Sequence, residues 1–330
     1  MKILVTGGGG FVGGAIVRQL RGRGDEVRTF SRGDYPELGA LGAEVVRGDL
    51  SDAEAVARAV RGCDAVIHVA ARPGVWGSWD SFYRPNVVGT ENVIRACRDS
   101  GVSRLVYTSS PSAVHGGGSI EGADESLPYP EHFDAHYPAT KAMAERLVLA
   151  ANDEVLSTVA LRPHLVWGPG DNHLLPRMVQ RSRAGKLALI GDGSQLVDTT
   201  WVEDAATAHL LALDKVSPGA ACAGRAYFLS QGEPWPLKDM MNGLLEAAGA
   251  PRVERCVPRW AAYTVGALLE GTYWLLRRTS EPPMTRWLAG QLGTSHWYDI
   301  SAARRDLGYE PSVTIAEGLE RLSEALSQSS

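Results

Sequence analysis

A glycine-rich turn near the start of the chain restricts the possible folds more than any other feature of the sequence. The stretch TGGGGFVGG follows a short apolar run, KILV, and opens a helical pattern. Gly8, Gly10 and Gly13 fit the spacing GxGxxG, and Gly7, Gly10 and Gly13 fit GxxGxxG. Either spacing predicts a tight turn whose backbone approaches a pyrophosphate at a helix N-terminus. We therefore predict that a dinucleotide is bound by Gly7, Gly10, Phe11, Val12 and Gly13.

Short apolar runs alternate with helical patterns over the first half of the chain and just beyond it. Strands are predicted at residues 2–7, 26–32, 43–49, 65–71, 104–110, 157–163 and 226–230. Helices are predicted at residues 11–24, 52–60, 86–100 and 137–151. Continuous apolar strands between helices indicate a parallel sheet covered on both faces. The predicted class is α/β, a Rossmann-type doubly wound parallel sheet with a smaller, mostly helical C-terminal substrate-binding part.

The two parts are predicted to be interleaved along the chain. We assign residues 1–172 and 193–230 to the dinucleotide-binding domain. The substrate-binding part takes residues 173–192 and 231–330, where strand–helix alternation ends and Pro-rich joints begin.

Composition and charge exclude several classes of function. The net charge of the 330-residue chain is -5 and its Lys and Arg residues are scattered, which argues against nucleic-acid binding. No basic-then-apolar leader precedes the first strand, so we expect a cytoplasmic protein. The four cysteines form no CxxC and no histidine cluster accompanies them, so no metal site is predicted, and we expect small core or surface residues.

The end of the second predicted strand bears on the choice of cofactor. A carboxylate at this place would bind the ribose 2′-hydroxyl of NAD. This chain has Ser31 and then Arg32, and no acid before Asp34. A hydroxyl beside a guanidinium suits the 2′-phosphate of NADP. We therefore predict that NADP(H) is favoured over NAD(H).

Tyr137 and Lys141 stand four residues apart in HYPATKAMAE, on one face of a predicted helix. A free tyrosine titrates near pH 10, and a neighbouring ammonium would lower its pKa towards the working range of an acid catalyst. The lysine could also bind the nicotinamide ribose. A hydroxyl at the end of the fifth strand would hold the substrate oxygen, and Ser110 is preferred to Ser109 for this role.

With the glycines, the serine, the tyrosine and the lysine in this order, the chain resembles the extended short-chain dehydrogenase/reductase family over essentially its full length. The resemblance implies Tyr137 as acid/base, Lys141 beside it and Ser110 orienting the substrate. NVVGT (residues 86–90) would be the helix packed under the site. His68 is interpreted as a core histidine, and whether His164 contacts a ligand stays open. Further cofactor contacts are implied for Asp49, Leu50, Ala70, Ala71, Lys141, Pro163 and His164.

Nucleotide-sugar dehydratases of this family usually carry Thr-Asp-Glu where this chain has Ser110, Pro111 and Ser112, and this difference argues against them.

The segment WAAYTVGALLEGTYWLL (residues 260–276) contains one charge and is bracketed by arginines. It is too short and interrupted for a membrane span, which needs about 20 apolar residues. A core helix is the default interpretation, and an interfacial helix or a wall of an apolar pocket are the alternatives. With the aromatic WGSWDSFY (residues 76–83), it suggests a lipid-like substrate.

Five longer stretches resemble the 3β-hydroxysteroid dehydrogenase branch: YTSSPSAVHG, PATKAMAERLVLAAN, LRPHLVWGPGDN, DTTWVEDAATAHLLAL and EPPMTRWLAGQLGTSHWYD. Within that branch the chain is most similar to bacterial reductases of 2-alkyl-3-oxoalkanoic acids in long-chain olefin biosynthesis. This resemblance implies NADPH-dependent reduction of the β-keto acid to the β-hydroxy acid. It also implies association with other enzymes of that pathway and a homodimer. Contact with a membrane surface through residues 260–276 is a further expectation.

The substrate carboxylate requires a cation, and Arg72, Arg84 and Arg177 are candidates that the sequence does not separate. An NAD-dependent hydroxysteroid or sterol dehydrogenase is the nearest alternative, because it would use the same catalytic residues. A nucleotide-sugar epimerase or dehydratase is less favoured. A non-catalytic NADP-binding sensor is disfavoured because Tyr137 and Lys141 are both present.

Overall fold

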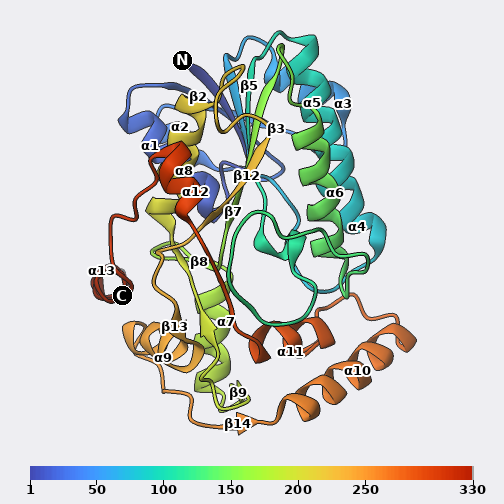
Figure 1. The fold of residues 1–330 in the computed structure, drawn as a ribbon, viewed down its shortest axis with the longest axis vertical. Coiled ribbons are helices and arrows are strands. Elements are labelled where there is room, and N and C mark those ends of the chain that lie inside the picture. Colours follow the sequence, from blue (N-terminus) through green and yellow to red (C-terminus); the bar gives the residue numbers. More distant parts are fainter. Residues whose placement is uncertain (329–330) are drawn as a thin grey trace.

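The computed structural model describes residues 1–328, and a seven-stranded parallel sheet lies at its centre (Figure 1). All seven predicted strands are confirmed, and the strand order is β12-β7-β5-β4-β1-β2-β3. The strands are β1 (Lys2–Thr6), β2 (Glu26–Ser31), β3 (Glu44–Arg47), β4 (Ala65–His68), β5 (Arg104–Thr108), β7 (Ser157–Pro163) and β12 (Arg225–Leu229).

Alternate residues of the central strands enter two different hydrophobic cores. In β1, Ile3 and Val5 belong to one core and Leu4 belongs to the other, because successive side chains point to opposite faces. One face is covered by α1 (Phe11–Gly22), α2 (Pro36–Ala40), α8 (Val202–Lys215) and α12 (Ser301–Leu307). The other is covered by α3 (Ala53–Val60), α5 (Gly89–Asp99) and α6 (His136–Ala150) (Figure 1). This two-sided packing confirms the doubly wound α/β prediction.

The strand order reverses direction between β1 and β4. The chain builds β1, β2 and β3 towards one edge, then returns to place β4 on the other side of β1. In open α/β sheets, ligands bind at the carboxyl ends of the strands where such a reversal occurs. Both the glycine turn after β1 and the segment after β4 lie at this point.

The helix predicted at residues 86–100 begins earlier in the structure. A helical run starts with α4 (Trp79–Tyr83), passes through a π-helical turn (Arg84–Val88) and continues as α5. Pro85 lies in that turn and has no N–H to donate, which explains why the hydrogen-bond pattern widens there. The aromatic residues of WGSWDSFY therefore belong partly to a helix.

The helices of a third hydrophobic core lie beneath the sheet (Figure 1). Its helices are α7 (Leu174–Arg183), α9 (Leu237–Ala247) and α13 (Ile315–Gln328). The short strands that accompany it are β6 (Ile120–Ala123), β8 (Val166–Trp167), β9 (Leu189–Ile190), β10 (Leu196–Val197), β11 (Thr200–Trp201), β13 (Trp235–Pro236), β14 (Cys256–Val257) and β15 (His296–Tyr298). The domain boundaries given above stay a prediction, although α12 packs against α8 and β12 rather than in this third core.

Helix α10 (Arg259–Leu275) does not lie in a core, so the default interpretation of residues 260–276 is wrong. Trp260, Leu268 and Trp274 are 74%, 67% and 77% exposed. Only Ala262 and Gly266 of this helix are buried, where it packs on α11 (Arg286–Gly293). No helix within residues 1–328 is both long and apolar enough to cross a bilayer. Contact between this exposed face and a membrane surface stays a prediction.

The crossing of β1 and α1 allows a direct test of the glycine turn. A Cβ on Gly13 would lie 2.1 Å from the Gly7 carbonyl oxygen, whereas a Cβ on Gly14 would make only an ordinary contact of 3.5 Å. We expect Gly13→Ala to lower the melting temperature and Gly14→Ala to leave it unchanged or raise it slightly, because alanine favours a helix. Thermal unfolding of both variants checks this. Equal melting temperatures would show that the turn is not packed as closely as described.

Candidate active site

The turn between β1 and α1 has the geometry of an anion-binding site. Gly7 adopts a φ of +71°, and its N–H donates to the Phe30 carbonyl at 2.8 Å. A Cβ on Gly7 would lie 2.8 Å from Ala70 Cα, so the turn packs directly on the segment after β4. Gly10 caps α1 without a side chain, which leaves the first N–H groups of the helix for a phosphate. These groups belong to Phe11, Val12 and Gly13.

Two arginines meet at the far ends of β2 and β3. Ser31 ends β2 and pairs in register with Arg47, the last residue of β3. Arg47 Nε donates to the Arg32 carbonyl at 3.3 Å, and both arginines are exposed. The Ser31 hydroxyl is buried and has no hydrogen-bond partner within residues 1–328. An unpaired buried hydroxyl beside two cations fits a phosphate-bearing ribose.

The other residues implied for cofactor contact line the same edge of the sheet. The Asp49 carboxylate accepts a hydrogen bond from the Ser51 N–H at 2.8 Å. Leu50 is buried, and Ala70 donates its N–H to Thr6 Oγ1 at 3.2 Å. Ala71, the next residue, is half-buried. Their contacts with a cofactor stay predictions.

Lys141 is almost completely buried at the carboxyl end of β5. Its Nζ donates to Tyr107 Oη at 2.7 Å and to the Thr108 carbonyl at 2.6 Å. Burial lowers the pKa of Lys141 to about 7, although the nearby Glu145 carboxylate opposes the shift. An ammonium has three N–H donors, so one stays available after these two hydrogen bonds.

The structure brings Tyr137 and Ser110 together. Burial raises the pKa of Tyr137, and a hydrogen bond with the Ser110 hydroxyl opposes this shift. The expectation that Lys141 lowers the pKa of Tyr137 is wrong for this structure, because the lysine donates to β5 and burial of the phenol dominates. Ser110 Oγ also accepts from Ser112 Oγ at 2.9 Å. Ser109, by contrast, extends the pairing of β5 with β7, because its N–H donates to the Leu161 carbonyl.

A buried ion pair holds the helix that carries Tyr137 and Lys141. Glu145 of α6 accepts from Arg162 Nε at 2.9 Å and from Arg162 Nη2 at 2.7 Å. Tyr129 Oη donates to the same carboxylate at 2.7 Å. Burial alone would raise the pKa of Glu145, but its hydrogen bonds with Arg162 outweigh this and the pKa is lowered. The pair joins α6 to β7 and so sets the position of the catalytic face.

His68 is a core histidine, as the sequence indicated. Its Nδ1 and Nε2 share hydrogen bonds with Thr6 Oγ1 at 2.7 Å and Thr90 Oγ1 at 3.0 Å. Burial lowers its pKa to about 3, so the ring is neutral. Asn86 of the NVVGT segment also joins two parts of the fold by hydrogen bonds. Its side chain accepts from the Arg72 N–H and donates to Thr140 of α6.

The side chain of His164 is bound to other side chains of the protein. Its Nδ1 forms a 2.5 Å hydrogen bond with the buried carboxylate of Asp198, and its ring packs against His296 and Tyr298. His164 follows Pro163, the last residue of β7, and its N–H donates to the Leu229 carbonyl at 3.1 Å. Direct cofactor contact by Pro163 or His164 stays a prediction.

The three arginines proposed for the substrate carboxylate occupy different surroundings. Arg177 forms an ion pair with Glu281 at 3.0 Å. Arg72 lies 4.8 Å from the centre of the Phe82 ring, and Arg84 is exposed in the π-helical turn. This arrangement leaves the carboxylate partner unassigned.

The comparison with protein families decides the class of this site. Residues 4–259 match the sequence profile of the 3-beta hydroxysteroid dehydrogenase/isomerase family. The chain belongs to this family. It is therefore an extended short-chain dehydrogenase/reductase and an oxidoreductase, as the resemblance implied.

Individual relatives cover nearly the whole chain. It is 56% identical to the 2-alkyl-3-oxoalkanoate reductase of Stenotrophomonas maltophilia over 98% of each chain. It is 48% identical to the 2-alkyl-3-oxoalkanoate reductase of Shewanella oneidensis over 98% of this chain and 85% of the relative. The solved UDP-glucose 4-epimerase of Thermus thermophilus in complex with NAD covers 100% of each chain, with a TM-score of 0.75 and 26% identity.

A nicotinamide cofactor fits both this family and the described edge of the sheet. The turn at Gly7, the uncapped start of α1 and the orphan hydroxyl of Ser31 are the parts of the chain that would hold it. The turn at Gly7 and the start of α1 would bind the pyrophosphate that NAD and NADP share.

Sequence reasoning missed several residues that shape the site. Tyr107 anchors Lys141, Arg47 joins Arg32, and the Glu145–Arg162 pair holds α6. The two members of each contact come from different segments of the chain, so no local sequence pattern predicts that they meet. A weak signal was available for Arg162 and Glu145, since both are charged residues inside otherwise apolar segments.

Replacing Lys141 with Met tests the effect of burial on this lysine. Its folded pKa of about 7 lies below the unfolded value of 10.5, so between these values the unfolded chain binds more protons. The wild-type free energy of unfolding should therefore rise above pH 7, by about 1.4 kcal/mol per pH unit, and Lys141→Met should lack this contribution. Denaturant unfolding at several pH values measures the difference. The exposed Lys186→Met is the control, and a wild-type slope in Lys141→Met would contradict the prediction.

Proposed function

We propose that the protein reduces the 3-oxo group of a long-chain 2-alkyl-3-oxoalkanoic acid to the 3-hydroxy group with NADPH, in hydrocarbon (olefin) biosynthesis. The names of the two bacterial relatives, at 56% and 48% identity, support this substrate class. The observation that carries the proposal is that Ser110, after β5, lies close to Tyr137 of α6, with the buried Lys141 one helical turn away and bound to the end of β5.

The reaction moves a hydride to the ketone carbon and a proton to the ketone oxygen. NADPH supplies the hydride when it is bound. Tyr137 Oη donates the proton, and the Ser110 hydroxyl donates a hydrogen bond to the oxygen as negative charge builds there. The raised pKa of Tyr137 keeps the phenol protonated near neutral pH, which suits a proton donor in the direction of reduction. The remaining N–H of Lys141 would donate to a ribose hydroxyl of the cofactor.

The preference for NADPH rests on the ends of β2 and β3. Ser31, Arg32 and Arg47 supply one orphan hydroxyl and two guanidinium groups, and no carboxylate stands at the Ser31 position. A carboxylate there would favour NAD by accepting from the ribose hydroxyls, whereas guanidinium groups bind a phosphate.

The proposed substrate can be tested in the oxidative direction, because β-keto acids decarboxylate on standing. Purified protein would receive a 2-alkyl-3-hydroxy long-chain acid or a 3β-hydroxysteroid, each with NADP or NAD, while nicotinamide absorbance is followed. We expect turnover of the acid with NADP and little turnover of the steroid. Turnover of the steroid with NAD would favour the alternative of a hydroxysteroid or sterol dehydrogenase.

Tyr137→Phe separates catalysis from binding. Because a positioned proton donor is worth about 10²- to 10⁴-fold, we expect kcat to fall by that factor while NADPH affinity stays unchanged. Steady-state kinetics and fluorescence titration with NADPH measure the two effects. Tyr309→Phe, at a buried tyrosine whose Oη donates to the Ser230 carbonyl, is the matched control and should retain activity. Weaker NADPH binding by Tyr137→Phe would contradict a purely catalytic role.

Arg32→Gln and Arg47→Gln test the cofactor preference. Loss of a charge-assisted hydrogen bond to a 2′-phosphate should raise the KM for NADP about 10- to 100-fold and change the KM for NAD little. Arg58→Gln, on the exposed side of α3, is the control for a general change in charge. Parallel changes in both KM values would show that neither arginine recognises the phosphate.

The wider cellular setting is also proposed rather than observed. The resemblance supports a homodimer, a cytoplasmic location and association with other enzymes of olefin biosynthesis. The exposed apolar face of α10 supports contact with a membrane surface.

A further inference from the structure

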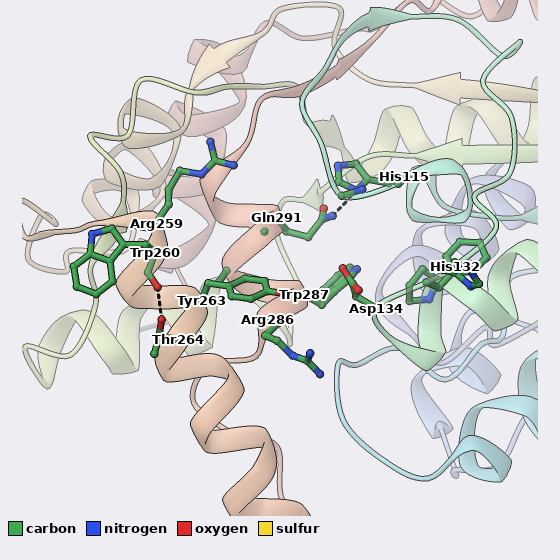
Figure 2. Close-up of a pocket in the computed structure, with 16 residues that line it drawn as sticks. His115, His132, Asp134, Arg259, Trp260, Tyr263, Thr264, Arg286, Trp287 and Gln291 are labelled. Carbon is green, nitrogen blue, oxygen red and sulfur yellow. Dashed lines mark hydrogen bonds between the residues drawn. The ribbon is translucent and has the colours of Figure 1, made fainter.

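Two separate cavities lie on opposite sides of helix α11. One, the aromatic cavity, has a volume of about 570 Å³ and is shown in Figure 2. The other, the apolar cavity, has a volume of about 350 Å³. The aromatic cavity is lined among others by Phe133, Trp260, Tyr263 and Trp287. The apolar cavity is lined among others by Leu165, Met178, Met240 and Leu244.

Neighbouring residues of α11 face different cavities. Trp287, Gly290 and Gln291 line the aromatic cavity, and Figure 2 shows Trp287 and Gln291 projecting from the helix into it. Leu288 and Leu292 line the apolar cavity. Positions four apart share one face of a helix, so the leucines form one side and Trp287 and Gln291 form another. Helix α11 is therefore the common wall of both cavities.

Close packing fixes this wall against α10. A Cβ on Gly266 would lie 2.7 Å from the Thr285 carbonyl carbon, just before α11 begins. Ala262 of α10 and Ala289 of α11 are both buried in one small core with Ile190. Small residues at these positions let the two backbones approach closely, and this contact holds α11 between the cavities.

Each cavity is lined by a residue that lies next in the sequence to a residue at the carboxyl edge of the sheet. Pro138, which follows Tyr137, lines the aromatic cavity, and Leu165, which follows His164, lines the apolar cavity. The ring of His115, in the lining of the aromatic cavity, packs at 5.8 Å on the ring of His296, and His296 packs at 5.1 Å on His164. The two cavities thus approach the same end of the sheet from different directions.

This division favours a branched flexible ligand. A rigid fused ring occupies one continuous volume, whereas two chains that leave one centre can pass on either side of a helix. The lining of the apolar cavity is mostly Leu, Met and Val side chains, which suits an alkyl chain. The wider aromatic cavity offers flat apolar rings together with polar groups such as Gln291 and His115.

We propose that α11 separates the two alkyl branches of the substrate, with one branch in each cavity. Leu288 and Gly290 then determine specificity for different branches of the same molecule. This inference rests on the proposed function, because it takes a 2-alkyl-3-oxoalkanoic acid as the substrate.

Two substitutions on α11 can fill one cavity each. A Cβ on Gly290 meets no atom within 4 Å, so Gly290→Leu extends into the aromatic cavity. Leu288→Trp extends into the apolar cavity. Gly290→Ala and Leu288→Ala are the matched controls that leave both cavities open. If Leu288→Trp does not fold, Leu174→Trp in the facing wall of the apolar cavity replaces it.

The substrates are two 2-alkyl-3-hydroxy acids, one with a long chain at C2 and a short chain at C3, and one with these lengths exchanged. Oxidation of each acid with NADP gives kcat/KM for the wild type and the variants. We expect Gly290→Leu to lower kcat/KM about tenfold for one acid and little for the other, and Leu288→Trp to do the reverse. NADPH affinity and melting temperature should match those of the alanine controls.

The possible results are distinct. Opposite selectivity of the two variants supports the separation of the branches. Three results would overturn it while the proposed function stands, because the wild type turns over both acids. The two variants could share one selectivity, each could lose activity equally on both acids, or neither could lose any. If the wild type turns over neither acid, the proposed function fails first and the assignment of branches falls with it.

Discussion

The buried ion pair between Glu145 and Arg162 is the interaction on which the geometry of the site depends. Two charges are removed from water there, and the arrangement is stable because the contact is bidentate and Tyr129 adds a third hydrogen bond. Loss of one partner from such a pair typically destabilises a protein by about 3–5 kcal/mol. Because Glu145 lies one turn beyond Lys141 on α6, the pair also sets the helix rotation that brings Tyr137 to Ser110.

Burial controls the charge of the groups around this helix. His68 and His296 have pKa values lowered to about 3, and Lys141 has a pKa lowered to about 7, in each case chiefly through burial. The two histidines are therefore neutral near neutral pH, whereas the charge of Lys141 changes in that range. Arg32 and Arg47, whose positive charges suit an anionic cofactor, lie at the exposed ends of β2 and β3.

Local patterns were sufficient to predict the strands, the glycine turn and the helix that carries Tyr137 and Lys141. They were sufficient because apolar runs and residue spacing report directly on secondary structure. The exposure of α10 could not be predicted, since an apolar helix has the same composition in a core and on a surface. The pKa of Tyr137 was predicted in the wrong direction, because its burial and the partners of Lys141 depend on how α6 meets β5. Arg47 was missed because only the register of β2 and β3 brings it beside Arg32.

The position of β12 at the edge of the main sheet has a consequence for how the chain folds. This strand comes from residues 225–229 but pairs with β7, and α12, from residues 301–307, packs against it. The sheet therefore remains incomplete until most of the polypeptide has been synthesised, and its unpaired β7 edge is exposed meanwhile. Contacts between such distant segments slow folding and leave strand edges open to association. The free edge of β7 is therefore open to such association until residues 225–229 pair with it.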